Sequence, residues 1–308
     1  WWAAIGSDLH AVLPNGVWRT SATLSKVASN WSIGVESDFG ATLRYFGSTV
    51  SAVDFVTIGS NLSDTVNVQL GSFTIDSEVV MAAGSRALWL RRFCRSVVDV
   101  NADTQDHVAV GNIRRLWHGI HFDSIDNVAW RGREVQGCQG DGIIVNGMSD
   151  IHGNLIGPNA ALILDDGYKI GGCLGAGIRC AGGFGGLYLG NGDTINNGEN
   201  LVVDRSRDVG LNREIVISGG SYDNAQNGSC VRIDEPGLLY FQASGAWFAT
   251  TAQNNTDVIT FQNFGGRAVF SGCRIYNSKR DGIRVNASSG VVLVDGCMVH
   301  HNGRQGVG

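Results

Sequence analysis

A short unit made of Gly and an apolar–any–apolar triplet recurs along this 308-residue chain. A strand with this alternation buries one of its two faces. A second unit, Ser or Asp followed by Gly, two further residues and an apolar one, recurs out of phase with the first. The first unit reads Gly119-Ile120-His121-Phe122, Gly142-Ile143-Ile144-Val145, Gly177-Ile178-Arg179-Cys180 and Gly282-Ile283-Arg284-Val285. The second begins at Ser218-Gly219, Ser244-Gly245, Ser271-Gly272 and Asp295-Gly296, with Gly-to-Gly steps of 26, 27 and 24 residues.

The two units also keep a constant offset. It is ten residues from Gly132 to Gly142, from Gly272 to Gly282 and from Gly296 to Gly306. A period of about 25 residues is too short for a propeller blade of ~40–45 residues. It predicts one coil of a β-solenoid, in which each coil pairs in register with the next and the inward side chains stack in columns.

Composition agrees with this fold. The chain has 44 Gly and only 3 Pro, the Gly residues lack the three-residue period of collagen, and 43% apolar residues argue against disorder. Gly, Asn and Asp suit the corners because they tolerate left-handed backbone. We therefore expect an all-β fold, a parallel β-helix that is regular from about residue 108 to residue 308.

Charge and cysteine content exclude several classes of protein. A net charge of −5 disfavours nucleic acid as a partner, and no apolar run approaches the ~20 residues needed to cross a bilayer, so we expect no membrane insertion. The seven Cys include no CxxC pair, which favours buried free thiols over a disulfide framework or a zinc site. Free thiols fit assembly in a reducing cytoplasm, as for a virion part.

The first 45 residues carry a more specific pattern. Leu13-Pro14-Asn15-Gly16-Val17-Trp18 is followed by Ala22-Thr23-Leu24 and then by a Gly-containing stretch that ends in Ala41-Thr42-Leu43. This order resembles the opening of the pectate-lyase-like right-handed β-helix of phage tailspikes and related depolymerases. In that family a short helix precedes an "LPxGxY" strand and two strands that end in "TL". Trp18 replaces the usual Tyr, and the spacing from Gly34 to Gly40 is longer than in the family pattern.

The resemblance implies a right-handed β-helix with a short N-terminal cap, residues 1–48 forming the cap and first strands and residues 49–308 forming the body. The abrupt start and end indicate a piece of a longer chain. The resemblance further implies a homotrimer in a virion tail or outside the cell, with a bacterial surface polysaccharide and other virion tail proteins as partners. The same scaffold carries lyases, hydrolases, epimerases and inert fibres, so activity must be argued from a site.

Aligned strands are expected to place like residues in columns along the rod. The middle residue of the first unit should point outward, and the residue after each strand should lie at a corner. Adjacent coils are ~4.8 Å apart, so carboxylates on neighbouring coils would have the ~5 Å separation of a retaining glycosidase, and carboxylates two coils apart the ~6.5–9.5 Å of an inverting one. The expected corner residues are Asp123, Asn146, Asp204, Asp234, Gln262 and Asn286.

Paired carboxylates are the main catalytic candidates, because glycoside hydrolysis needs one acid to protonate the leaving oxygen and another to activate water. Asp165-Asp166 follows the strand Leu162–Leu164, which predicts the same kind of corner, and an Asp pair after a strand resembles polygalacturonases, although their other motifs are absent. A simple turn is the alternative. The candidate catalytic residues are Asp165, Asp166, Asp204 and Asp234.

Substrate-binding candidates are outward arginines, aromatic residues and nearby polar groups. Arg179, Arg232 and Arg284 would grip the carboxylates or sulfates of an acidic glycan, or serve edge protection and solubility. Trp117, Trp130 and Trp247 would stack on sugar rings. The spacing of His118 and His121 matches no strong metal motif, so we expect no metal and no cofactor. The predicted substrate-binding residues are Arg179, Arg232, Glu235, Trp117, His121, Asp123 and Trp247.

These patterns favour a polysaccharide depolymerase that acts by carboxylate-pair hydrolysis. A lyase that acts on uronates is the second prediction, with Tyr168 or Lys169 as a possible base beside the Asp pair. A glycan-binding fibre or adhesin without turnover is the non-enzymatic alternative.

Overall fold

A computed structural model describes residues 2, 6–60, 62–103, 114–149, 155–157, 159–181, 184–204, 213–251, 255–286, 289–304 and 306–308. None of these residues lies in an α-helix, and strands, turns and bends make up the fold. The all-β prediction is therefore confirmed. The described part of the chain has no helix that is long and apolar enough to span a membrane.

The strands form two large sheets whose neighbours are parallel, plus a small antiparallel pair, β15 (Met148–Ser149) with β16 (Leu155–Gly157). The ten-stranded sheet contains β3 (Leu24–Lys26), β6 (Asp54–Ile58), β9 (Arg86–Arg91), β11 (His118–Asp123), β14 (Ile143–Asn146), β19 (Ala176–Cys180), β22 (Glu199–Val203), β25 (Val231–Asp234), β28 (Ile259–Gln262) and β31 (Ile283–Asn286). The 21-stranded sheet contains β1 (His10–Leu13), β2 (Gly16–Thr20), β4 (Trp31–Val35), β5 (Ala41–Tyr45), β7 (Thr65–Val66), β8 (Val68–Ser77), β10 (Phe93–Asp103), β12 (Asp126–Trp130), β13 (Glu134–Gln136), β17 (Asn159–Leu164), β18 (Lys169–Gly171), β20 (Phe184–Leu189), β21 (Asp193–Ile195), β23 (Glu214–Ser218), β24 (Ser221–Ala225), β26 (Tyr240–Ser244), β27 (Trp247–Thr250), β29 (Arg267–Ser271), β30 (Arg274–Tyr276), β32 (Val291–Asp295) and β33 (Met298–His300).

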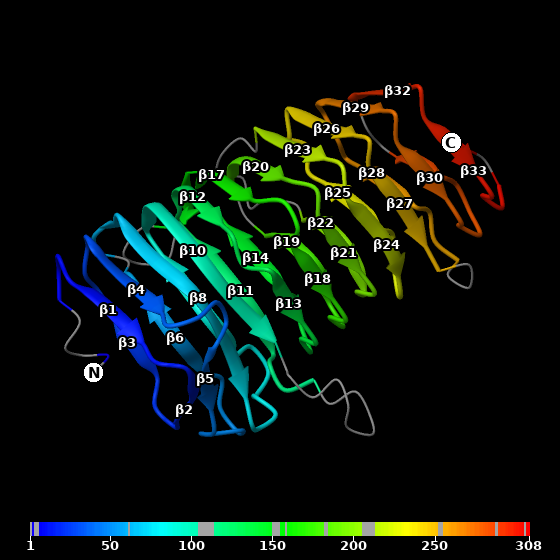
Figure 1. Ribbon diagram of the computed structural model, residues 1–308. Coiled ribbons are helices and arrows are strands. Elements are labelled where there is room, and N and C mark those ends of the chain that lie inside the picture. The colour runs from blue at the N-terminus through cyan, green and yellow to red at the C-terminus, as the bar shows by residue number, and fades with distance from the viewer. Residues whose placement is uncertain are drawn as a thin grey trace.

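From β11 onward, each coil contributes one strand to the ten-stranded sheet and then two to the 21-stranded sheet, as β19, β20 and β21 do before β22 begins the next coil. The coils stack into a rod with the N-terminus and the C-terminus at opposite ends (Figure 1). The register confirms the predicted apolar column, which runs through Ile120, Ile143, Ile178, Leu201, Val231, Ile259 and Ile283.

The core is the stack of inward side chains between the sheets. Its largest members in the C-terminal half are fully buried aromatic residues, among them Phe241, Phe261 and Phe270. The Phe261 ring lies 5.0 Å from the Phe264 ring, 5.8 Å from that of Phe241 and 6.1 Å from that of Phe270, measured between centroids. Aromatic pairs at these separations add to the stability of the core beyond the apolar area that they bury.

The corners follow the predicted chemistry. Gly245, Gly272 and Gly296 lie between the two consecutive strands that each of three successive coils contributes to the 21-stranded sheet, with φ values of 62°, 62° and 57°. This left-handed backbone strains residues that carry a Cβ atom, which explains why Gly recurs there. The cysteines are free thiols, and the backbone N–H of Cys273 donates to Cys297 Sγ at 3.3 Å, as expected for equivalent positions one coil apart.

The N-terminal strands belong to the same stack. Strand β1 pairs with β4, β2 pairs with β5, and β3 pairs with β6, all of them parallel. The segment that resembles the tailspike opening therefore forms the first coils of the rod.

Candidate functional site

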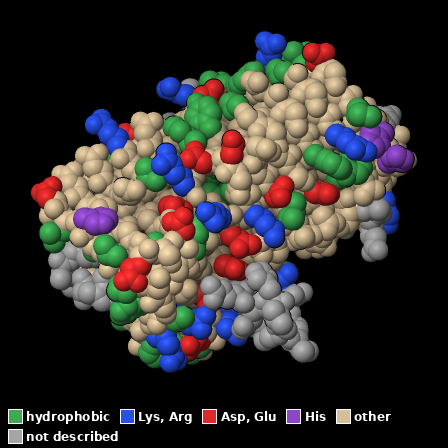
Figure 2. Space-filling view, viewed as in Figure 1, with side chains coloured by type: hydrophobic (Ala, Val, Ile, Leu, Met, Phe, Trp, Pro, Cys, Tyr) green, Lys and Arg blue, Asp and Glu red, His purple; other side chains and the backbone are tan. Residues whose placement is uncertain are grey.

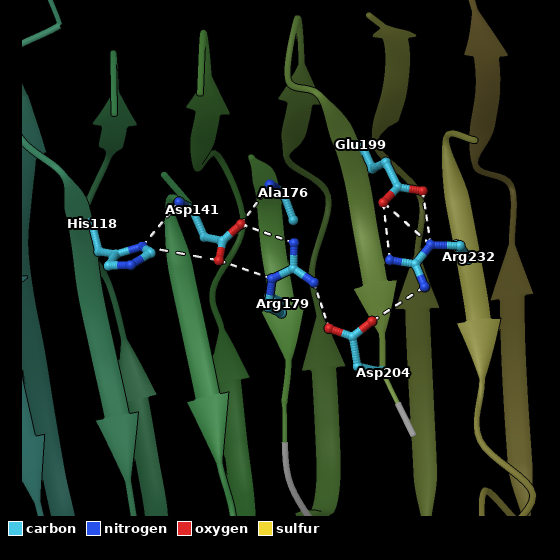
Figure 3. A network of polar contacts seen from close by, with 7 residues as sticks. All are labelled: His118, Asp141, Ala176, Arg179, Glu199, Asp204 and Arg232. Carbon is cyan, nitrogen blue, oxygen red and sulfur yellow. Dashed lines mark hydrogen bonds and ion pairs between the residues drawn. The ribbon is translucent and has the colours of Figure 1, made fainter. Parts of the chain in front are cut away.

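The outward face of the ten-stranded sheet carries a row of alternating charges, which we call the ion-pair row: His118, Asp141, Arg179, Glu199, Asp204 and Arg232 (Figure 3). Arg179 and Arg232 occupy the middle of β19 and β25, two coils apart, and Val202 of β22 lies between them in the same register. Acidic and basic side chains also lie close together across the middle of the face that Figure 2 shows.

Arg179 holds two carboxylates. Its Nε donates to Asp141 Oδ2 at 2.8 Å and its Nη2 to Asp141 Oδ1 at 3.2 Å, while Nη1 donates to Asp204 Oδ2. Asp141 Oδ1 also accepts the backbone N–H of Ala176 at 2.6 Å. These hydrogen bonds to two carboxylates raise the pKa of Arg179 against the opposing effect of burial, which is the larger single influence.

Arg232 repeats the arrangement two coils farther along the rod. Its Nε donates to Glu199 Oε1 at 3.0 Å and its Nη2 to Glu199 Oε2 at 3.1 Å, while Nη1 lies 3.2 Å from Asp204 Oδ1. Asp204 therefore sits between two guanidinium groups with one carboxylate oxygen on each. Its side chain is 35% exposed, against 10% for Asp141, so Asp204 is the more accessible of these two carboxylates.

His118 closes the row on the N-terminal side. Its Nδ1 accepts the backbone N–H of Asp141 at 3.0 Å, which requires that nitrogen to be unprotonated. Burial lowers the pKa of His118, and Asp141 partly opposes that effect. His118 is thus a neutral member of the row.

The predicted corner column is present in the register. Asp123 pairs with Asn146, Val203 pairs with Ile233, and Asp234 pairs with Gln262. Because Asp204 and Asp234 directly follow Val203 and Ile233, they occupy equivalent corners on adjacent coils. Asp234 Oδ1 accepts a hydrogen bond from Asn263 Nδ2 at 2.8 Å.

An aromatic and basic cluster lies farther toward the N-terminus on the same sheet. The Trp89 ring lies between the guanidinium carbons of Arg86 and Arg91, at 3.6 Å and 4.0 Å from its centroid, and 6.2 Å from the His121 ring. Arg86 also forms a two-bond ion pair with Asp54, at 2.6 Å and 3.0 Å. Trp89 was not among the residues predicted from the sequence. The alternation of side chains along Arg86–Arg91 was the signal that could have found it.

Sequence reasoning also missed Asp141 and Glu199. Asp141 directly precedes the Gly of its repeat unit, and Glu199 begins β22 opposite Ala176. A polar residue just before the strand, also seen at His118 and Asp281, was the signal that could have found them.

The position of His121 in the outward column was predicted correctly, but the prediction that its side chain is exposed to solvent was wrong. His121 is aligned with Ile144 and Arg179 as expected, yet it is only 7% exposed. Its Nδ1 lies 3.3 Å from Arg86 Nη1, and its Nε2 lies 2.7 Å from the side-chain amide of Asn146. Burial, helped by Arg86 and His118, lowers the pKa of His121 to about 3.

The lowered pKa of His121 predicts that the folding stability of the protein depends on pH. In the unfolded chain His121 takes up a proton near pH 6.5, but the folded protein excludes that proton until about pH 3, so folding stability falls as the pH drops through this window. Each pH unit costs at most about 1.4 kcal/mol. Unfolding by urea at pH 6.5 and pH 5 should show a loss in the wild type that exceeds the loss in His121→Gln by more than about 1 kcal/mol. Parallel losses in the two proteins would contradict this assignment.

The structure places Asp165 and Asp166 on the other sheet, so the prediction that they share the corner of Asp204 was wrong. They follow β17, which pairs with β12 and β20 in the 21-stranded sheet. Asp165 Oδ2 accepts Arg131 Nε at 2.8 Å on the preceding coil, and Asp166 Oδ1 accepts the backbone N–H of Asn191 at 2.6 Å on the following coil. The two side chains therefore turn apart along the rod.

These two aspartates nevertheless line a groove. It has a volume of about 590 Å³, and its lining includes Ile163, Tyr188 and Val216. The Tyr188 hydroxyl donates to Glu214, and this hydrogen bond raises the pKa of Tyr188. An apolar floor with a tyrosine and two carboxylates is a second candidate surface for a sugar.

The tryptophans divide between core and surface. Trp130 is fully buried with its Nε1 donating to the Val100 carbonyl at 3.0 Å, so its predicted role in sugar stacking was wrong. Trp117 is half-buried and lies edge-on to His118, beside the ion-pair row. Trp247 points outward as predicted but belongs to the 21-stranded sheet, where it packs against Tyr276 and Arg274.

The remaining predicted residues lie near the ends of the row. Asp123 is buried, and its Oδ1 accepts Ser124 Oγ at 3.2 Å. Glu235 is also buried, and its Oε1 accepts the backbone N–H of Gly237 at 2.7 Å, which fits a turn-forming role. Within the described ranges, no cluster of three or more His, Cys, Asp or Glu side chains is arranged to hold a metal ion.

Comparison with known proteins identifies the fold class. No family model matches the sequence, and a search of curated proteins finds no match. Among solved structures, the Streptococcus pneumoniae surface protein and adhesin PfbA aligns with 97% of this chain and 90% of its own, at 11% identity and a TM-score of 0.50. The A-module of an Azotobacter vinelandii mannuronan C-5 epimerase aligns with 99% of this chain and 88% of its own, at 14% identity and a TM-score of 0.46. The ORF18 protein of Geobacillus virus E2 aligns with 99% of this chain at 12% identity and a TM-score of 0.43, and this chain spans 55% of its length.

The likeness to PfbA shows the fold and carries no activity with it. It agrees with the stacked parallel strands, and the chain is a right-handed parallel β-helix.

Proposed function

We propose that this chain is the β-helix body of a phage tailspike-type depolymerase that binds and hydrolyses a bacterial surface polysaccharide. The observation that carries the proposal is the pair of carboxylates at equivalent corners of adjacent coils, Asp204 and Asp234. Adjacent coils are ~4.8 Å apart, close to the ~5–5.5 Å between the carboxyl groups of retaining glycosidases.

The surroundings of the two carboxylates suggest their roles. Asp204 lies between the guanidinium groups of Arg179 and Arg232 with one carboxylate oxygen on each, and it would attack the anomeric carbon. Asp234 accepts a hydrogen bond from the neutral side-chain amide of Asn263 and would be the proton donor. Half-buried Trp117 and neutral His118 would border the sugar on the N-terminal side.

The groove of Asp165 and Asp166 is a second candidate site, favoured by its volume of about 590 Å³ and its tyrosine wall. We rank it below the corner pair because these two aspartates are held toward opposite neighbouring coils.

The tailspike assignment rests on the N-terminal pattern, Leu13 to Leu43. On this assignment the protein would form a homotrimer, would be located in the virion tail or outside the cell, and would contact other tail proteins. Ile163, Trp247 and Leu293 support an assembly, because each is 40% exposed on the 21-stranded sheet and would be covered by neighbouring subunits.

The test is digestion of purified capsule, O-antigen and exopolysaccharide preparations. We expect new reducing ends without an unsaturated, ultraviolet-absorbing product, and NMR of the first product should show the anomeric configuration of the substrate. An unsaturated product would instead indicate a uronate lyase. Tight binding without new reducing ends would indicate a glycan-binding fibre or adhesin. If the protein neither binds nor cleaves any of these polysaccharides, the proposal is overturned.

A further inference from the structure

We infer that the glycan lying across β14, β19, β22 and β25 presents uncharged sugar units to this face, and that the carboxylates of the ion-pair row exclude acidic ones. The inference rests on the proposed function for its ligand, a polysaccharide. It names the class of sugar from the way in which the arginines of the row are already engaged.

The best hydrogen-bond donors of Arg179 and Arg232 are already engaged. A guanidinium recognises a sugar carboxylate best through a pair of parallel N–H donors. In Arg179 the Nε and Nη2 pair is occupied by Asp141, and in Arg232 the same pair is occupied by Glu199. Nη1 of both arginines is engaged by Asp204. A uronate would therefore have to displace an internal carboxylate from each fork.

The net charge of the ion-pair row also disfavours an acidic sugar. Asp141, Glu199 and Asp204 face Arg179 and Arg232, and His118 is neutral, so the row has one more negative charge than positive. A further carboxylate at about 4 Å would be repelled by ~1 kcal/mol in water and by ~4 kcal/mol at a partly buried surface. A displaced internal carboxylate would also stay nearby, because it is part of the chain.

The residues around the ion-pair row offer no further cationic binding strip on this face of the described coils. Ile144 and Val202 occupy the outward column beside the arginines and are buried apolar side chains, so the column is no continuous anion-binding strip. At the far end, Arg284 is engaged by Asp281 and Asn286, each at 2.9 Å. Carboxylate oxygens accept hydrogen bonds from sugar hydroxyls, which suits an uncharged glycan.

A binding experiment tests the exclusion directly, with tetragalacturonate as the acidic probe and calorimetry as the readout. The wild type should bind it negligibly. Glu199→Gln releases the fork of Arg232, and Asp141→Asn releases that of Arg179, so each variant should bind the probe at least roughly tenfold more tightly than the wild type. This gained affinity should weaken as salt is raised.

The matched control releases an arginine elsewhere. Glu78→Gln frees Arg19, which lies on β2 away from the row, and should leave binding of the probe at the wild-type level. Salt-sensitive binding by the wild type would overturn the inference. So would unchanged binding by both row variants when circular dichroism shows that they are folded, or equal gains in the control.

A second experiment separates this inference from the proposed function. A panel of neutral and acidic bacterial polysaccharides is digested with the wild-type protein. Cleavage restricted to polymers with neutral repeating units supports both ideas, whereas cleavage of a polymer whose every sugar is acidic overturns the inference and leaves the proposed function standing. If no polymer in the panel is bound or cleaved, the proposed function fails, while the tetragalacturonate result still decides the charge exclusion.

Discussion

Asp204→Asn and Asp234→Asn are each expected to lower kcat on the cleaved polysaccharide by about 10²–10⁴-fold. Asn is close in size to Asp but can neither attack as a carboxylate nor donate an acid proton. The fold should survive both changes, because Arg179 and Arg232 keep Asp141 and Glu199 as partners when Asp204 is replaced. Reducing-end release under saturating substrate measures the effect.

The matched controls are Asp165→Asn and Asp166→Asn, which make the same chemical change on the 21-stranded sheet. We expect these two variants to keep activity within a fewfold of the wild type. The reverse pattern, inactive groove variants beside active Asp204→Asn and Asp234→Asn, would move the catalytic site to the groove. Full activity in all four variants would remove both candidate sites.

Phe261→Ala is expected to lower the free energy of unfolding by about 3–5 kcal/mol, the cost of removing a large aromatic side chain from a packed core. The Phe261 ring is fully buried and touches the rings of Phe241, Phe264 and Phe270 in neighbouring positions of the stack. Urea unfolding followed by tryptophan fluorescence measures the loss.

Phe46→Ala is the control for this core variant. Phe46 is 41% exposed and its ring lies 5.2 Å from the Arg19 guanidinium, so its removal should cost less than about 1 kcal/mol. Because each coil contacts only its neighbours, amide exchange in Phe261→Ala should increase most in β25, β28 and β31. A uniform increase along the rod would contradict this local picture.

The repeat allowed the fold and the columns to be predicted, because coil spacing in a β-helix fixes which residues align. Ile120 with Ile143, and Asp204 with Asp234, follow from the Gly and strand positions alone. The repeat does not reveal which of the two sheets a strand belongs to, because the strands of a coil have the same alternation. This is why Asp165 was expected beside Asp204 although it belongs to the other sheet.

The partners of the charged residues also escaped prediction. Arg232 pairs with Glu199 at the start of the preceding coil's strand, and Arg179 pairs with Asp141 in the same way. Such contacts depend on how long side chains bend across the ~4.8 Å between coils, which periodicity does not encode. Burial of Trp130 and His121 was missed for a related reason, since neither residue type specifies whether it will be covered.

The one-strand-plus-two arrangement of each coil has an evolutionary consequence. Gain or loss of a complete turn of the rod changes its length by ~4.8 Å and leaves every remaining side chain on its original face. An insertion of a single residue within a strand instead reverses the orientation of the residues that follow it. Lineages of this protein should therefore differ by whole turns and by loop length, and the reach of the rod along a glycan can be adjusted independently of the chemistry on its surface.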